Sequence, residues 1–250
     1  MNKKQYIYLD NGEKIYYEIS NSVSDKQNSI VVLCHGFSSS MFSKTNCFLK
    51  TYLEKFHIPT IAFDFFGHGK SSGKFEDLTI SQCVYDIQSI LSFLRNEKGY
   101  KKIGIIGSSF GGLTSLIAAS LIEDVVCALG LIAPITDPKN ATKIIAHHLG
   151  INLDEWMNDE IPYDENKRLK YSFYQDAYSI RYSLDNIKVP LLIAHGTNDY
   201  VVPVTESERI FWTKDNCFLL SVRNIEHGFQ DTPEYRSLLM LVASFVVEKL

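Results

Sequence analysis

The chain has 250 residues, of which 45% are hydrophobic and 22% charged, and its formal net charge at pH 7 is -4. These values are typical of one large globular domain and argue against intrinsic disorder. The negative charge disfavours nucleic acid as a partner, because neutralising phosphates requires a basic surface. No run of 18 apolar residues occurs, so we expect neither a membrane span nor a membrane partner.

Cysteine usage and the first residues indicate the compartment. The five cysteines are odd in number, lack CxxC spacing and mostly fall in apolar runs, which is typical of buried thiols in a reducing environment. The first twenty residues alternate polar and apolar side chains and offer no continuous signal-peptide core. We therefore expect a cytoplasmic protein. A homodimer is left open, because nothing in the sequence decides the oligomeric state.

Strand and helix patterns alternate along most of the chain. Two alternating segments surround Asp10-Asn11-Gly12, which is a strong hairpin signal. Apolar runs of strand length follow at 29–36, 58–65, 102–107, 126–134 and 189–196. Helical patterns lie at 44–56, 80–97, 110–123, 204–212 and 233–249. This alternation predicts an α/β fold with a mostly parallel, eight-stranded sheet, helices on both faces and an antiparallel hairpin at one edge.

Residues 135–185 interrupt the alternation, because they contain no comparable apolar strand run and are rich in tyrosine and in charges of both signs. We interpret them as a small cap inserted over the carboxyl end of the sheet, which leaves 1–134 and 186–250 as the core domain. An ordinary surface excursion is the alternative. Four tyrosines follow a helical spacing, and their face either packs on the core or covers a pocket: Tyr171, Tyr174, Tyr178 and Tyr182.

A candidate nucleophile follows the strand predicted at 102–107. The segment Gly107-Ser108-Ser109-Phe110-Gly111 matches G-x-S-x-G only with Ser109 at its centre, since centring on Ser108 would require glycine where Ile106 and Phe110 stand. The motif describes a sharp turn between a strand and a helix that lifts the serine hydroxyl above the sheet. A turn that merely caps the following helix is the alternative explanation.

A serine hydroxyl needs a base and an orienting acid to act as a nucleophile. Asp199 follows the strand at 189–196, and His227 follows the last strand. The order Ser109, Asp199, His227 is the chain order that this architecture uses, and each residue comes just after a strand. The competing acids are Asn198 (formally), Asp215 and Glu226, while His195 is interpreted as structural.

The oxyanion of a tetrahedral intermediate needs two preorganised N–H donors. One is expected from Phe110, the residue after the nucleophile, and the second from the loop after the first buried parallel strand. There, His35-Gly36-Phe37 fits if Gly36 permits the backbone turn and the amide of Phe37 is the donor. A simple glycine turn at the strand end is the alternative.

Two further motifs carry no cofactor chemistry. Gly69-Lys70-Ser71 resembles the end of a phosphate loop, but that motif would require glycine at position 64, where Asp64 stands. The adjacent His147 and His148 would project about 100° apart on a helix, and no HExxH or cysteine–histidine cluster supports them. We therefore expect no cofactor and no metal.

The motifs HGF (35–37), DFFGHGKSSG (64–73), GSSFGG (107–112), GTND (196–199) and EHGF (226–229) resemble, in order and spacing, those of the α/β-hydrolase superfamily over essentially the whole chain. Within it, the sequence is similar to bacterial feruloyl (cinnamoyl) esterases and related carboxylesterases, and to a broader group that contains monoacylglycerol lipases. The resemblance implies an α/β-hydrolase fold with Ser109 as nucleophile, His227 as base and Asp199 as its partner. It also implies an oxyanion hole formed by the amides of Phe37 and Phe110.

One position departs from that resemblance: many relatives have histidine where Ser108 stands, and the position normally supports packing. The sequence thus predicts a serine hydrolase that cleaves a small-molecule carboxylic ester. A monoacylglycerol lipase, a thioesterase and a small peptidase are alternatives within the fold, and a non-catalytic binding module is the alternative from another class.

Overall fold

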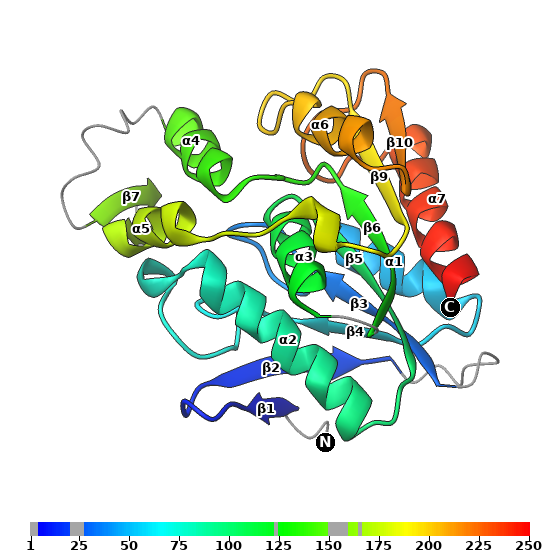
Figure 1. The fold of residues 1–250 in the computed structure, drawn as a ribbon, viewed down its shortest axis with the longest axis horizontal. Coiled ribbons are helices and arrows are strands. Elements are labelled where there is room, and N and C mark those ends of the chain that lie inside the picture. The colour runs from blue at the N-terminus through cyan, green and yellow to red at the C-terminus, as the bar shows by residue number, and fades with distance from the viewer. Residues whose placement is uncertain (1–4, 21–27, 123–124, 150–159, 165–166) are drawn as a thin grey trace.

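The computed structural model describes residues 5–20, 28–122, 125–149, 160–164 and 167–250. Within these ranges, eight strands form one sheet in the order β1-β2-β4-β3-β5-β6-β9-β10 (Figure 1). They are β1 (Tyr6–Tyr8), β2 (Lys14–Ile19), β3 (Ser29–Cys34), β4 (Thr60–Phe63), β5 (Lys102–Ser108), β6 (Val126–Ile132), β9 (Leu191–Gly196) and β10 (Cys217–Val222). The predicted α/β fold with a mostly parallel eight-stranded sheet is confirmed.

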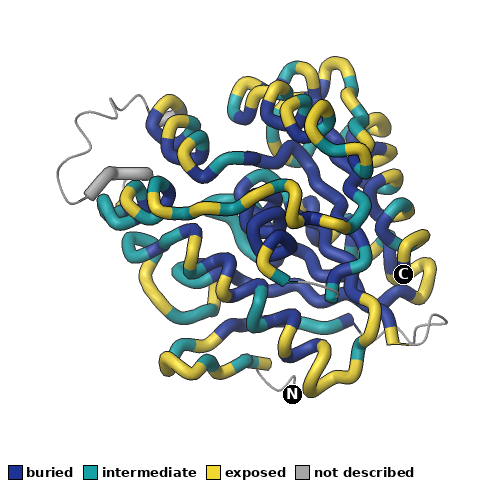
Figure 2. Tube along the Cα trace, viewed as in Figure 1, coloured by how far each residue is buried: buried dark blue, intermediate teal, exposed yellow. Residues whose placement is uncertain are grey.

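The central strands are apolar because both of their faces are covered. Every residue of β3, β4 and β9 is buried, and Figure 2 shows the middle of the sheet as the most deeply buried part of the chain. Six neighbouring strands of this sheet, β4, β3, β5, β6, β9 and β10, pair in parallel, whereas β2 pairs antiparallel with both β1 and β4. The carboxyl ends of the parallel strands therefore meet at one edge, where ligands bind in sheets of this kind.

Helices cover the sheet on two sides (Figure 1). On one side α1 and α7 pack around the side chains of Leu49 and Val242, and on the other α2, α3 and α6 share a second hydrophobic cluster. The helices of the core are α1 (Lys44–Glu54), α2 (Ile80–Asn96), α3 (Phe110–Leu121), α6 (Thr205–Thr213) and α7 (Pro233–Lys249), with a short 3-10 turn, η1 (Phe75–Asp77).

Two of these helices begin beside the carboxyl edge of the sheet and have well-defined starts. The Ser43 hydroxyl caps α1 by accepting a hydrogen bond from the N–H of Asn46. The Thr232 hydroxyl caps α7 in the same way, and Pro233 follows at the first helical position, where a missing N–H costs nothing. Within the described residues, no helix is long and apolar enough to cross a membrane.

The segment 135–185 contains α4 (Pro138–Leu149), the antiparallel pair β7 (Glu160–Asp164) and β8 (Lys167–Lys170), α5 (Tyr171–Ser179) and the start of η3 (Leu184–Asn186). Residues 150–159 and 165–166 of the predicted cap lie outside the described ranges. Because α5 ends at Ser179, Tyr182 does not share its helical face as the spacing predicted. Its hydroxyl instead donates to the carbonyl of Thr136. The division into core and cap stays a prediction.

Candidate active site

The backbone at Ser109 has the strained geometry of a nucleophile elbow. β5 ends at Ser108 and α3 begins at Phe110, which leaves Ser109 as the turning residue with φ 53° and ψ -115°. A positive φ is unfavourable for a residue with a side chain and is retained where the surroundings enforce it. A Cβ on Gly111 would collide with the backbone carbonyls of Cys34 and His35. This glycine therefore lets the elbow pack directly on the end of β3.

The His227 ring lies between Ser109 and Asp199. Its Nδ1 is 2.7 Å from Asp199 Oδ2, and its Nε2 is 3.1 Å from Ser109 Oγ. A carboxylate only accepts hydrogen bonds, so Nδ1–H donates to Asp199 and Nε2 accepts from the Ser109 hydroxyl. The structure thus brings the three predicted residues together in the order nucleophile, base and acid.

Asp199 is buried and fixed from several sides. Its Oδ1 accepts the backbone N–H groups of Val201 and Val202 at 2.9 and 2.8 Å. His195 Nε2 lies 3.4 Å from Oδ2. Burial raises the pKa of this carboxyl, but the hydrogen bonds from His195 and His227 and the N–H of Val202 outweigh it and hold the pKa well below its usual range. Asp199 therefore stays ionised in neutral and mildly acidic solution.

The competing acids do not reach the histidine ring. Both ring nitrogens of His227 are engaged, by Asp199 and Ser109, which leaves no position for Glu226 or Asp215. Both of these carboxylates are exposed. His195, interpreted as structural, is fully buried between Ser207 Oγ and the carbonyl of Val202, at 2.6 and 2.9 Å. Its contact with Asp199 was not anticipated, since no local pattern pairs these two side chains.

The loop after β3 lies against the elbow, as expected for an oxyanion loop. A Cβ on Gly36 would sit 3.6 Å from Ser109 Cβ, and the rings of Phe37 and Phe110 are 5.5 Å apart. Phe110 begins α3, so its N–H is one of the first-turn donors that have no partner inside the helix. Gly36 is not in the left-handed region, so the turn itself does not require glycine, contrary to the sequence-based argument.

The His35 side chain holds this loop in place through two hydrogen bonds. Its Nδ1–H donates to the carbonyl of Gly36 at 2.8 Å, and its Nε2 accepts the N–H of Phe65 at 3.2 Å. Burial, together with the neighbouring His68, lowers the pKa of His35 to about 3. The ring is therefore neutral and able to accept and donate at once. It ties the loop to the end of β4.

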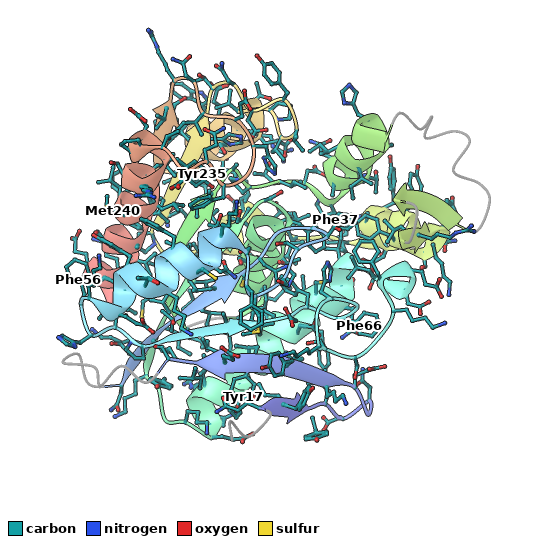
Figure 3. All side chains as sticks on the ribbon, turned by 180° about the vertical axis from the view of Figure 1, so that it is seen from behind. Tyr17, Phe37, Phe56, Phe66, Tyr235 and Met240 are labelled. Carbon is teal, nitrogen blue, oxygen red and sulfur yellow. The ribbon has the colours of Figure 1, made fainter. Side chains whose placement is uncertain are left out.

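A cavity of about 500 Å³ opens over Ser109 and His227. Figure 3 shows Phe37 on the side of the molecule that carries α4 and α5. One part of the lining is aliphatic: Ile135, Ile144, Ile145, Val201 and Val202. The other part is polar and comes from the start of α1 and the loop before it: Ser39, Ser43, Lys44 and Thr45. The cavity is thus amphipathic.

The segment 64–73 is a structural turn beside the site. Asp64 is buried, and its carboxylate accepts the backbone N–H groups of Met41 and Lys70 at 2.8 and 2.9 Å. A phosphate loop would instead direct its N–H groups toward a ligand. Asp64 connects this turn to the chain that leads into α1, and so it supports the polar wall of the cavity.

Glu206 on α6 holds the beginning of the segment 135–185, and the sequence contained no signal for it. Its carboxylate accepts from the N–H and the hydroxyl of Thr136, at 2.9 and 2.6 Å, and from Asn140 Nδ2 at 2.6 Å. The adjacent N–H of Ile135 donates to the carbonyl of Ser109 at 3.3 Å. A buried network thus connects α6, the cavity wall and the elbow.

An elbow serine, a histidine bonded to it and a buried carboxylate, all at the carboxyl edge of a mostly parallel sheet, define the class of α/β hydrolases. Residues 29–176 match the family described as alpha/beta hydrolase fold. The chain therefore belongs to this family. The individual roles of Ser109, His227 and Asp199 stay predictions.

Comparisons with known proteins agree with this assignment. The mitochondrial palmitoyl-protein thioesterase ABHD10 of Rattus norvegicus is 26% identical over 235 residues, covering 88% of this chain and 76% of that protein. The putative esterase/lipase 2 of Mycoplasma pneumoniae is 24% identical over 208 residues, covering 73% and 75%. Among solved structures, ferulic acid-bound Est1E of Butyrivibrio proteoclasticus superposes with a TM-score of 0.81 at 24% identity and 98% coverage of each chain.

Proposed function

We propose that this protein is a serine hydrolase that cleaves small-molecule carboxylic esters through an acyl-enzyme. The proposal rests chiefly on one observation, the pair of hydrogen bonds that joins Ser109 Oγ to His227 Nε2 and His227 Nδ1 to Asp199. The cavity of about 500 Å³ above these atoms, of a size that holds a small organic ligand, supports it.

In the first half of the reaction, Ser109 Oγ attacks the ester carbonyl while His227 Nε2 takes the hydroxyl proton. Ionised Asp199 stabilises the imidazolium that forms. The negative carbonyl oxygen is held by the amides of Phe37 and Phe110, the proposed oxyanion donors. The intermediate then collapses: the bond to the leaving oxygen breaks, His227 returns its proton to that oxygen, and the alcohol departs from an acyl-Ser109.

In the second half, water occupies the position that the alcohol has left. His227 removes a proton from the water as its oxygen attacks the acyl carbonyl, and the same two amides hold the second oxyanion. Collapse breaks the bond to Ser109 Oγ, which recovers the proton from His227. The products are the carboxylic acid and the free enzyme. No redox step occurs, and the proposal requires no cofactor or metal.

For the acyl group, we propose an apolar or aromatic acid of the feruloyl (cinnamoyl) type. The aliphatic wall of the cavity and the ring of Phe37 suit such a group, and the structural neighbour Est1E is described with ferulic acid bound. The segment 135–185, proposed as the cap, contributes Ile135, Ile144 and Ile145 to that wall. A soluble cytoplasmic enzyme remains part of the proposal.

Thioester hydrolysis is the second candidate, because the rat relative is named as a palmitoyl-protein thioesterase. The same residues would serve both reactions, since a thiolate leaves from the same tetrahedral intermediate. A matched oxygen ester and thioester of one acyl group separate the two candidates by their kcat/KM values.

The experiment that tests the proposal compares Ser109→Ala with Ser108→Ala on p-nitrophenyl butyrate. Removing the nucleophile is expected to lower kcat by roughly 10⁴-fold or more, whereas Ser108→Ala retains most of the activity. Circular dichroism controls for folding in both variants. Retained activity in Ser109→Ala, or an equal loss in the two variants, contradicts the proposal.

A further inference from the structure

The two walls of the cavity come from different parts of the fold. The aliphatic wall includes Ile144 and Ile145 of α4, a helix that packs on α5. The polar wall is the start of α1, which packs on α7. In Figure 1, α4 lies at the upper left, to one side of the sheet, and α1 lies behind the sheet. A substrate in the cavity therefore meets aliphatic residues from one part of the fold and serine, lysine and threonine residues from the other.

The polar wall lies on the histidine side of Ser109. Phe229 follows His227 by two residues and lines the cavity, and its ring contacts Phe48 of α1 and Tyr235 of α7 at 6.4 and 5.5 Å between centroids. Thr45 on α1 hydrogen-bonds to the same tyrosine. The His227 loop and the start of α1 are thus held side by side.

This placement assigns the two halves of an ester to the two walls. The leaving oxygen must receive its proton from His227 Nε2 and so departs on the His227 side. The leaving group therefore extends along the start of α1, and the acyl group extends along the aliphatic residues of the segment 135–185, which are Ile135, Ile144 and Ile145.

Lys44 decides the charge of the leaving-group side. Of the residues that line the cavity, all within the described ranges, Lys44 alone carries a permanent charge at neutral pH. It forms none of the ion pairs found in the described part of the chain. Ser39 and Ser43, which carry hydroxyl groups, also line the cavity. An ammonium group among hydroxyls is suited to bind a carboxylate or a phosphate.

We propose that Lys44 is a specificity-determining residue, and that the substrate is an ester with an apolar acyl group and a leaving group that carries an anionic substituent, carboxylate or phosphate. This inference rests on the proposed function, because it uses His227 as the acid that protonates the leaving oxygen. It adds the chemistry of the alcohol half of the ester, which Ser109, His227 and Asp199 do not specify.

The test uses three butyrate esters that share the acyl group: 4-(butyryloxy)benzamide, which is neutral, 4-(butyryloxy)benzoate and 4-(butyryloxy)phenyl phosphate. The quantity measured is the ratio of kcat/KM for each anionic ester to kcat/KM for the neutral one, in which the general reactivity of each variant cancels. Lys44→Met keeps most of the apolar stem and removes the charge. Lys50→Met, on the same helix but outside the cavity lining, is the matched control.

We expect Lys44→Met to lower the ratio by about 10-fold, because it removes a charge-assisted contact. Lys44→Glu lowers it further, Lys50→Met leaves it unchanged, and added salt weakens the preference of the wild type. The carboxylate and phosphate arms show which anion is preferred. An unchanged ratio in Lys44→Met overturns the inference while ester hydrolysis stands. Inactivity of the wild type toward all three esters overturns the proposed function, and the inference with it.

Discussion

The carboxylate of Glu206 accepts two hydrogen bonds from Thr136, one from its backbone N–H at 2.9 Å and one from its hydroxyl at 2.6 Å. The two residues are 70 positions apart, on α6 and at the start of the segment 135–185. The next residue back, Ile135, lines the cavity and donates to the carbonyl of Ser109. Glu206 thus fixes the position of the cavity wall relative to the turn at Ser109.

Removing this carboxylate is expected to be costly. Glu206→Ala leaves the donors of Thr136 and Asn140 without their acceptor in a buried setting, and we expect the free energy of unfolding to fall by about 3 kcal/mol. Urea denaturation measures it. Glu208→Ala on the same helix is the control, and is expected to stay within about 0.5 kcal/mol of the wild type. A similarly small effect of Glu206→Ala would show that the network does not stabilise the fold.

Asp199 is expected to be the acid that orients His227. Asp199→Asn preserves the shape of the side chain but presents an amide to His227 Nδ1 and removes the charge that stabilises the imidazolium, so kcat falls by about 10⁴-fold. Asp215→Asn, at an exposed carboxylate that does not contact His227, is the matched control and keeps its activity. Steady-state kinetics on one ester decide between them, and a comparable loss in Asp215→Asn would refute the assignment.

We expect a single protonation event to account for the fall of kcat/KM in acid. His227 accepts the serine proton only when it is neutral, so activity falls in acid. Asp199, whose pKa is held well below its usual range, remains ionised there and adds no second proton. The acid limb of a plot of log kcat/KM against pH is therefore expected to have a slope of 1. A slope of 2 would mean that the carboxylate titrates together with the histidine.

The buried carboxyl of Asp86 is expected to make the free energy of unfolding depend on pH. Burial raises the pKa of Asp86 to about 7, although the N–H of Phe66 and the amide of Gln82 donate to it. The folded protein therefore binds a proton that the unfolded chain, with an Asp pKa of about 3.9, has released. The stabilisation that this proton contributes is fully present below pH 3.9 and is lost as the pH rises through about 7.

Asp86→Asn isolates this contribution. The wild type minus Asp86→Asn difference in the free energy of unfolding is expected to fall by about 2.5 kcal/mol between pH 5 and pH 8. Urea denaturation of both proteins at the two pH values gives that difference directly. A constant difference would mean that Asp86 does not titrate in this range.

Much of the fold follows from patterns that are local in the chain. The helix expected at 233–249 matches α7, and that at 80–97 matches α2 except for its last residue. The strands could be predicted from continuous apolar runs, because parallel strands are buried on both faces, and the end of each run indicated the turn that follows. The same reasoning placed Ser109, Asp199 and His227 just after strands, and the structure brings His227 within hydrogen-bond distance of the other two.

What the sequence did not reveal depends on contacts between distant residues. Glu206 and Thr136, 70 positions apart, meet only through tertiary packing. The strands β7 and β8 lie in a charged segment without an apolar run, so period and hydrophobicity did not indicate them. Tyr182 fits a helical spacing, yet the chain leaves α5 at Ser179, because spacing alone does not mark where a helix ends.

We propose that Ser109, and not its neighbour Ser108, is the nucleophile. The most direct measurement is covalent labelling with an alkyl fluorophosphonate, followed by tandem mass spectrometry of the peptide that contains both serines. We expect one adduct per chain, located on Ser109, with loss of esterase activity in proportion to labelling and no labelling of Ser109→Ala. An adduct on Ser108, or an active enzyme that remains unlabelled, would contradict this proposal.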